Sequence, residues 1–484
     1  MDLSGLVALA MNPQHDAGAV AGANRLVPQL SYSGLVIFGV SYMAPAIVIA
    51  TFGVIAVLSQ GATVLAYAVA TVAMLLTALS YGKLARAFPT SGSIYTYARG
   101  TLGSHAGFLA GWVILLDYLF LPMVAWLITG LYISVQFPFL PSWGWGLVII
   151  AVTTIVNIIG VRLADRLNRV LLVIVLLAVA AAVVGGTVFA ASEGHAVAPA
   201  ILPADLALPA VVAGAAVAAY SFLGFDAVST LSEEVKDARR NVPRAIVAVV
   251  LIGGGIFILV AFVLQWAHPG FDFAAPDTAG FEIMGMIGGP VFAGFVNAAM
   301  LIGTIASCLA VQASGSRLLF VMGRDGVLPR RIFGRLSARF RTPVVSLLII
   351  AAIGVAGQLF TVGDATSLIN FGAFLAFATA NVCVIVLWMR APERPRAGGG
   401  VIGWILVPIA GVVVDLFLLA NLSPLALGIG SAWVVLGLVV LAVLTRGFRR
   451  PVPSIDLDAA AADAPAGAAS AAAAAEPESL APRA

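Results

Sequence analysis

Charged side chains are scarce in this sequence. Only 10% of its 484 residues are Asp, Glu, Lys or Arg, whereas about 25% are charged in an average soluble domain. Hydrophobic residues make up 61% of the chain, and the mean hydropathy is +1.07. This composition excludes a soluble globular fold and predicts an all-α polytopic membrane protein.

Lysine, cysteine and histidine are also rare, and each shortage excludes a kind of site. The two lysines, Lys83 and Lys236, stand at the ends of apolar runs, so neither lies at mid-membrane. The two cysteines, Cys308 and Cys383, lie in separate apolar runs and predict small core residues, not a disulfide framework. The four histidines lie apart, so we expect no metal site.

Short motifs of common membrane enzymes and motors are missing as well. The sequence contains no GxxxxGK[ST], HExxH or GxSxG run, which argues against a nucleotide-driven motor, a zinc protease and an esterase. The segments between apolar runs are too short for a soluble output domain. We therefore expect a protein that is not an enzyme and has no cofactor, with a polytopic sensor or membrane enzyme as the alternative of a different class.

Twelve apolar runs are long enough to cross about 30 Å of hydrocarbon. All 25 Lys and Arg residues fall on one side of the resulting topology, while the opposite connectors carry acids such as Glu193, Asp272 and Asp364. The positive-inside rule then predicts a protein of the cell inner (plasma) membrane with both termini in the cytoplasm. Orientation in the lipid bilayer explains the basic connectors without a nucleic-acid partner. The runs are approximately 32–58, 63–82, 107–136, 143–161, 170–191, 207–232, 245–266, 281–315, 344–361, 365–389, 401–420 and 426–445.

Two of these spans contain residues that interrupt a helix. In the first span Gly39 loosens the helix, and Pro45 removes a backbone donor and clashes with the preceding turn. The sixth span is interrupted at Gly224. Since the two breaks lie five spans apart in the chain order, an odd number, the second unit enters the membrane from the opposite face. Interrupted helices at corresponding positions of inverted halves predict a transporter binding site near the midplane.

This pattern divides the chain into five parts. They are a cytoplasmic N-terminal segment (1–30), a first repeat of five spans (31–200), a second, inverted repeat of five spans (201–390), two further spans (391–447), and a disordered Ala/Pro-rich cytoplasmic tail (448–484).

Two acids lie near the middle of these spans. A charge at mid-bilayer costs about 2.5–3.5 kcal/mol on insertion scales, so such acids usually have a function. Asp226 follows the break at Gly224, and we interpret it as a binding acid; the alternative is a structural acid bonded to a neighbouring helix. Asp117 lies about ten residues into the third span and is either a second binding acid or a structural or protonated acid on a packing face.

Other polar residues in the spans have simpler interpretations. Glu233, two helical turns after Asp226, is a candidate exit station or proton acceptor; the alternative is an interfacial acid balanced by Lys236 and Arg239. Asp415 in the eleventh span lies outside the predicted repeats. Interhelical hydrogen bonds are expected from three asparagines: Asn157, Asn370 and Asn381.

Several longer stretches carry a resemblance to a known family. They are SYGKL (80–84), FPxSGSxY (88–95), LDYLFLP (116–122), SFLGFDAV (221–228) with LSEE (231–234), SRLLxVMGRD (316–325) and LINFGA (368–373). On these stretches the chain resembles the amino acid–polyamine–organocation superfamily of transporters, and within it the branch of bacterial putrescine importers. The resemblance extends from about residue 30 to residue 450.

The resemblance implies a fold of two inverted five-helix repeats, with helices one and six unwound around the substrate and two helices appended. Amino acid transporters of the superfamily usually carry a Gly-Ser-Gly-like run in helix one, whose backbone N–H groups receive the substrate carboxylate. Here the corresponding run has Val40, Tyr42 and Met43 around Ser41, where such an anion nest would need glycine. A substrate without a carboxylate fits this run better.

We therefore predict a secondary active importer of a small polyamine, putrescine first, that works by alternating access. Two separated acids would bind the two ammonium groups, and aromatic faces between them would add cation–π attraction. Proton coupling through Asp226 or Glu233 is suggested by the resemblance. The alternative is a cationic or neutral amino acid permease or exchanger of the same fold. The candidate substrate-binding residues are Asp226, Asp117, Ser41, Tyr42, Met43, Tyr118, Ser221, Phe222 and Phe225.

Overall fold

The computed structural model describes residues 30–89, 93–160, 165–324, 328–337, 339–340, 342–391, 400–450 and 452. These residues form helices and short connections without a β-strand; Leu30 and Val235 make one isolated bridge. The predicted N-terminal segment, apart from Leu30, and most of the predicted C-terminal tail lie outside the described residues. The helices are α2 (Tyr32–Tyr42), α3 (Ile47–Leu58), α4 (Thr63–Ala87), α5 (Ser93–Leu102), α6 (Ser104–Gln136), α7 (Ser142–Ile159), α8 (Asp165–Ser192), α9 (Val197–Ile201), α10 (Leu208–Ala218), η1 (Ala219–Phe222), η2 (Asp226–Glu234), α11 (Ala238–Ala267), η3 (Pro276–Thr278), α12 (Ala279–Arg324), α13 (Arg330–Phe333), α14 (Val344–Gly357), α15 (Val362–Arg390), η4 (Ile402–Leu406), α16 (Val407–Ala420) and α17 (Pro424–Leu444).

The helices confirm an all-helical membrane protein. Within the described residues, ten helices are long and apolar enough to span a bilayer, and the bent pair α2–α3 would make an eleventh span. The predicted ninth run corresponds to α14, which is apolar but only 14 residues long. Each predicted run thus has a helix at its place, while the total of twelve spans remains a prediction.

The first predicted break is present, but it is centred on Pro45 and not on Gly39. Helix α2 ends at Tyr42, α3 begins at Ile47, and the two axes differ by 49°. Gly39 lies inside α2, where a Cβ atom would come within 2.5 Å of a methyl group of Val249. Its role is therefore close packing against α11, and Pro45 is the residue that cannot continue the helix.

The second predicted break is also present. Helix α10 passes into the 3₁₀ turn η1, which ends before Leu223, and a second 3₁₀ segment, η2, begins at Asp226. Between them Gly224 has a φ of 112°, a conformation that is readily available only to glycine. The unwound segment therefore depends on this residue.

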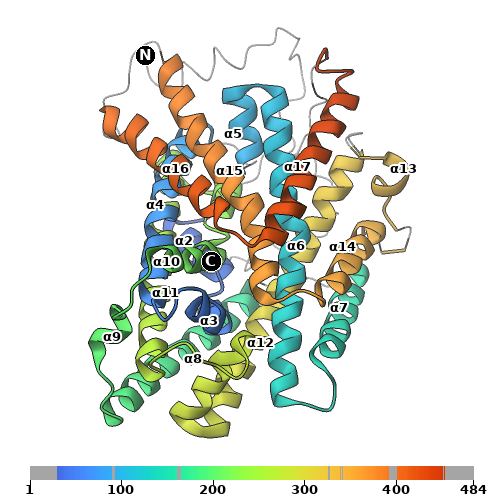
Figure 1. The fold of residues 1–484 in the computed structure, drawn as a ribbon. Helices are drawn as coiled ribbons and strands as arrows, with labels where there is room; N and C mark the ends of the chain where they lie inside the picture. Colours follow the sequence, from blue (N-terminus) through green and yellow to red (C-terminus); the bar gives the residue numbers. More distant parts are fainter. Residues whose placement is uncertain are drawn as a thin grey trace, which may run out of the picture.

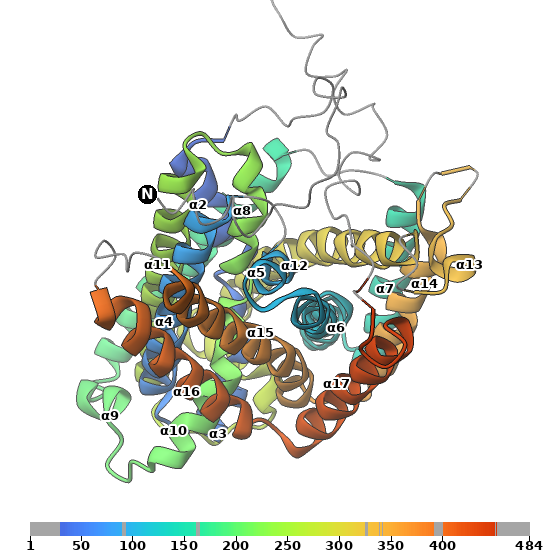
Figure 2. The ribbon, with the colours of Figure 1, turned by 90° about the horizontal axis from the view of Figure 1, so that it is seen from above.

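The helices pack in two groups around these breaks (Figures 1 and 2). In the first group α4 packs against α10 and α11, α2 packs against α11, and α3 packs against α10. In the second group α6 packs against α7, α12 and α14. Seen from above, α6 runs through the middle of the molecule, with α12, α15 and α17 around it (Figure 2).

Two long helices connect the groups in matching ways. Helix α8 contacts α11 of the first group and α12 of the second, and α15 contacts α4 and α6. Within the second group, α6 packs on α7 as α12 packs on α14. These paired contacts are those expected if spans one to five and six to ten are related by a two-fold axis, although the repeat boundaries themselves remain a prediction.

Polar side chains join helices at several depths, as predicted for the three asparagines. Asn157 donates from Nδ2 to Gln312 Oε1 at 2.8 Å, and Asn370 donates to the Ala216 carbonyl at 2.7 Å. Both cysteines are fully buried and form no disulfide, which confirms that they are core residues.

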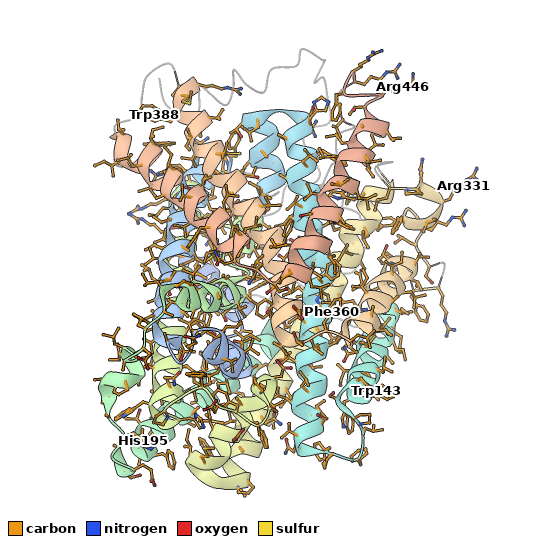
Figure 3. The ribbon with its side chains drawn as sticks, in the orientation of Figure 1. Trp143, His195, Arg331, Phe360, Trp388 and Arg446 are labelled. Atoms are coloured by element: carbon orange, nitrogen blue, oxygen red, sulfur yellow. The ribbon has the colours of Figure 1, made fainter. Side chains whose placement is uncertain are left out.

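Figure 3 shows Arg331 and Arg446 toward one end of the molecule and His195 and Trp143 toward the other.

Candidate functional site

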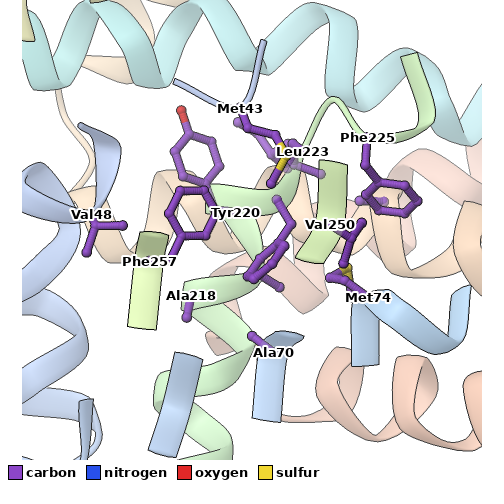
Figure 4. Close-up of a cluster of buried hydrophobic side chains, with 14 of the residues drawn as sticks. Met43, Val48, Ala70, Met74, Ala218, Tyr220, Leu223, Phe225, Val250 and Phe257 are labelled. Atoms are coloured by element: carbon purple, nitrogen blue, oxygen red, sulfur yellow. The ribbon is translucent and has the colours of Figure 1, made fainter. Parts of the chain in front are cut away.

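The two breaks meet inside the protein. A Cβ atom on Gly224 would lie 2.1 Å from Cδ1 of Tyr42, so the backbone of the second break packs directly against the last residue of α2. Next to this contact is a small cavity of about 40 Å³, bounded by α2–α3, α6, the η1 segment and α12. Residues of both breaks line it; they are Tyr42, Met43, Ala44, Ile47, Tyr220 and Leu223. Figure 4 shows Met43 and Leu223 close to each other beside the unwound segment.

Two predicted acids and two predicted tyrosines come together beside this cavity. The hydroxyl of Tyr42 interacts electrostatically with Asp117, Tyr118 and Asp226, and Tyr118 interacts with both acids. The two carboxyl groups also repel each other. Asp117 Oδ1 is buried without a hydrogen-bond partner among the described residues. An acid with one buried, unpartnered oxygen, interacting with a second acid, is a ready site for a cation.

Asp226 is held by its own loop. Its side chain is only 8% exposed, and the backbone N–H groups of Gly224 and Ala227 interact with its carboxylate. The Ala227 N–H also donates to the Gly224 carbonyl at 3.1 Å, so the unwound loop supports the negative charge through backbone N–H groups that are partly used in its own turn. Tyr81 on α4 and Tyr97 on α5 lie near the same carboxylate. Asp226 therefore fits a binding acid, although the local bonds would also suit the alternative of a structural acid.

The predicted aromatic residues of the second break pack into the protein and do not line the cavity. The Phe222 ring lies edge-on to Phe257 with centroids 5.0 Å apart, and Phe225 packs against Tyr81 and Phe377. Both phenylalanines are fully buried. In Figure 4 Phe225 is set apart from Met43 and Leu223. The two rings therefore pack the unwound segment against residues of α4, α11 and α15.

The two predicted serines are bonded to protein groups. Ser221 Oγ lies 3.2 Å from the Tyr67 hydroxyl, which in turn lies 3.2 Å from Thr51 Oγ1. Ser41 Oγ donates to the Ile37 carbonyl at 2.8 Å, a bond within α2. Neither serine lines the cavity. The backbone of Glu233 belongs to η2, but its side chain lies outside what the structure describes, so its predicted role remains a prediction.

Several cavity residues were missed at the sequence level. Leu121 and Ala125 of α6, and three residues of α12, complete its wall. Those of α12 are Thr304, Ser307 and Val311. Helix α12 is apolar along most of its length, so no charge or break in the sequence marks this face. The only signal was the small hydroxyl residues at 304 and 307, one helical turn apart.

A second, larger cavity of about 550 Å³ lies apart from the two mid-span acids. It is bounded by the ends of α3, α10 and α15 and by the connection between α16 and α17, and it contains Asp277 and Asp364. Thr361 Oγ1 donates to Asp364 Oδ2 at 2.9 Å. We place the candidate site around the smaller cavity because residues of both breaks line it and one of them, Tyr42, interacts with both mid-span acids and with Tyr118, which lie outside the lining itself.

Comparisons with known proteins agree on one family. The sequence profile described as amino acid permease matches residues 31–391. The low-affinity putrescine importer PlaP of Escherichia coli is 36% identical over 428 residues, which cover 87% of this chain and 94% of the importer. The branched-chain amino acid permease BcaP of Bacillus subtilis is 25% identical over 449 residues (88% and 95%). The methylthioribose transporter of the same organism is 27% identical over 456 residues (90% and 97%).

Proposed function

This chain belongs to the amino acid permease family, and from that premise we propose that it imports a small diamine, putrescine first. The observation that carries the proposal is the convergence of Asp117, Asp226, Tyr42 and Tyr118 where the two helix breaks meet. Membership in the family agrees with the resemblance found in the sequence motifs. The similarity to a putrescine importer supports this choice of substrate.

The charges and rings of the site suit a flexible dication. An ammonium group between Asp117 and Asp226 would relieve their mutual repulsion and give Asp117 Oδ1 the donor that it lacks. The faces of Tyr42 and Tyr118 would add cation–π attraction of about 2 kcal/mol or more in a desolvated site. The cavity of about 40 Å³ has room for roughly three water molecules, so a diamine requires the site to widen as it binds.

Helix one offers little to a carboxylate. The backbone N–H groups of Met43 and Ala44 donate to carbonyl oxygens of α2, and Pro45 has no N–H. The bulky side chains of Tyr42 and Met43 occupy the cavity wall, where an amino acid carboxylate would need exposed N–H groups. An amino acid would therefore bring its carboxylate close to Asp226 without compensation.

We propose alternating access as the transport mechanism, with both termini in the cytoplasm and repeats at residues 31–200 and 201–390. The division of the helices into two packing groups, connected by α8 and α15, is compatible with one group rocking against the other. The broken helices belong to the first group and face α6 and α12 of the second across the cavity. Such a movement would open the cavity to each side in turn.

Asp226 is the proposed proton carrier, because its carboxylate would exchange a proton for the substrate ammonium as the site opens. Coupling is not essential for accumulation, since a dication entering at −100 mV gains about 4.6 kcal/mol, a gradient on the order of a thousandfold. The test is putrescine uptake into proteoliposomes at a clamped potential with a pH dye inside. Proton entry that matches uptake supports coupling, and uptake without proton movement refutes it.

The second candidate is an amino acid permease, which the family description and the similarity to BcaP favour. The two functions are separated by competition against labelled putrescine in proteoliposomes that contain only this protein. Putrescine should compete at least about tenfold better than ornithine, or 1.4 kcal/mol, and leucine should not compete. If ornithine or leucine competes better than putrescine, the protein is an amino acid permease and our interpretation of helix one is wrong.

A further inference from the structure

A third acid inside the spans belongs to a helix outside the predicted repeats, none of whose residues lines the cavity. Asp415 belongs to α16, which packs against α4 and α15. Its side chain is fully buried in an apolar helix. Asp415 Oδ2 accepts hydrogen bonds from Thr77 Oγ1 of α4 and from Asn381 Nδ2 of α15, both at 3.0 Å. Three helices therefore meet at one carboxyl group.

The hydrogen bonds define which atoms donate. Asn381 Nδ2 also lies 3.2 Å from the Phe377 carbonyl, which can only accept, so the amide nitrogen must be on this side. The same nitrogen also lies 3.0 Å from Thr77 Oγ1, so its two hydrogens are shared among three acceptors, one of which is Asp415 Oδ2. The hydroxyl proton of Thr77 is then directed to Asp415 Oδ2. Thr77 Oγ1 and Asn381 Nδ2 therefore both donate to the same carboxyl oxygen, Asp415 Oδ2.

The other oxygens of the acid and of the amide have no donor. Asp415 Oδ1 and Asn381 Oδ1 are both buried without a hydrogen-bond partner among the described residues. A buried oxygen without a donor is costly, and the cost is greatest when it carries part of a negative charge. These two oxygens belong to side chains that the bond from Asn381 Nδ2 to Asp415 Oδ2 already joins, and each of them lacks a donor.

No described charge on the surrounding helices balances an ionised Asp415. Lys83 of α4 donates to the Gly403 carbonyl and Arg86 to the Arg239 carbonyl, while Arg390 of α15 donates to the Thr101 carbonyl. Helices α10 and η4, which also contact α16, contain no titratable residue. The remaining titratable residues of α4 and α15 are Tyr67, Tyr81, Asp364 and Cys383, and none has a recorded interaction with Asp415.

We infer that Asp415 is a proton-binding site: it holds a proton on Oδ1 and donates it to Asn381 Oδ1. Together with the bond from Nδ2 to Oδ2, this proton closes an acid–amide ring that satisfies both unpartnered oxygens. A Cβ atom on Gly411 would lie 2.6 Å from Asn381 Nδ2, so the amide is packed directly against α16. This packing favours a proton over a larger cation. The resulting group is neutral and ties α16 to α4 and α15.

The first test is thermal unfolding of the detergent-purified protein between pH 5 and pH 8. Between pH 5 and pH 8 the folded protein would keep Asp415 protonated, whereas the unfolded chain would already have released this proton. Stability should therefore fall as pH rises, and the unfolding constant should increase by up to tenfold per pH unit. Asp415→Asn, which has no proton to lose, should show a flatter slope, whereas Asp205→Asn in an exposed loop should keep the wild-type slope. Equal slopes for wild type and Asp415→Asn would overturn the inference.

The second test is infrared spectroscopy, which does not depend on the folding of one variant. A protonated-carboxyl band should disappear in Asp415→Asn and shift in Thr77→Val, which removes a donor to Oδ2 but leaves Oδ1 intact. If Asp415→Asn does not fold, the shift in Thr77→Val decides alone; an unshifted band would refute the assignment. If sodium, but not choline, stabilises the wild type and this effect is lost in the variants, the site binds a cation and the inference is wrong.

Putrescine uptake by Asp415→Asn, expected within about twofold of wild type, serves as the check of folding.

Discussion

At the scale of single residues, the proposed site contains one acid whose carboxylate has hydrogen-bond donors and one acid with an oxygen that has none. Backbone N–H groups of its own loop support Asp226, whereas Asp117 Oδ1 has no described donor. A first ammonium group therefore gains most by approaching Asp117, since it fills an empty hydrogen-bonding position there. Asp226 already interacts with backbone N–H groups, so it is better suited than Asp117 to attract the positive charge of the substrate without being its only hydrogen-bond partner.

Exchange of each acid for its amide tests this difference. Asp226→Asn should lower putrescine uptake at least about hundredfold, because the paired charge at the break is lost. Asp117→Asn should weaken diamine binding at least about tenfold but change monoamine binding less. Binding and uptake are measured on the purified variants, with Asp205→Asn in an exposed loop as the control. Equal losses for diamine and monoamine in Asp117→Asn would make Asp117 a structural acid.

Gly224 is the third residue on which the proposed site would depend. Gly224→Ala should lower uptake at least about tenfold, because the new methyl group would meet Tyr42 and φ at this position is 112°. Gly255→Ala is the matched control, since a Cβ atom at Gly255 meets nothing within 4 Å. Uptake of both variants is compared at equal amounts of folded protein. Normal uptake by Gly224→Ala would mean that the two breaks do not need this contact.

At the scale of elements, the positions of most helices could be predicted from the sequence, but which side of each helix faces the cavity could not. Apolar runs long enough to cross the bilayer each correspond to a helix, because the cost of unpaired backbone in lipid leaves few alternatives. The short helix α5, with Arg99 and four tyrosine or threonine residues, was missed because it is not apolar along its length. Its sequence pattern predicts neither a membrane span nor a loop.

The faces of the second break were the least predictable feature. An α-helical spacing would bring Phe222, but not the adjacent Phe225, to the same side as Asp226, whereas η1 and η2 are 3₁₀ segments separated by Gly224. The change of winding turns both rings toward α4, α11 and α15. Gly39 was misassigned for a related reason: a helical glycine permits either a bend or a close contact, and only the neighbouring helix distinguishes them.

Proline offers a test of the first break. Pro45→Ala should let α2 and α3 approach one continuous helix, which would move Tyr42 and Met43 and lower uptake at least about tenfold. Pro122→Ala in α6 is the control, because α6 is already continuous through Pro122 and should lose at most about threefold. The distance between spin labels at the ends of α2 and α3 would report the bend. An unchanged bend in Pro45→Ala would assign it to packing instead of proline.

At the scale of the whole molecule, labelled basic residues and the acids of the larger cavity have different surroundings. Arg331 and Arg446 lie toward one end (Figure 3), while the larger cavity contributes Asp277 and Asp364. Basic residues retained at one face orient a membrane protein during insertion, and carboxylates in an open cavity raise the local concentration of cations. One distribution of charge would thus serve both insertion and the supply of a cationic substrate.

The burial of both cysteines has a practical consequence for this topology. Because Cys308 and Cys383 are inaccessible, the natural protein should be silent to a membrane-impermeant maleimide, and a single introduced thiol can be detected without removing either of them. In intact cells Asp205→Cys should be labelled, whereas Arg449→Cys should be labelled only after permeabilisation; both positions are exposed. Labelling of Arg449→Cys in intact cells would reverse the proposed orientation. The buried sulfur atoms therefore make the natural sequence a ready background for mapping which surface faces the outside.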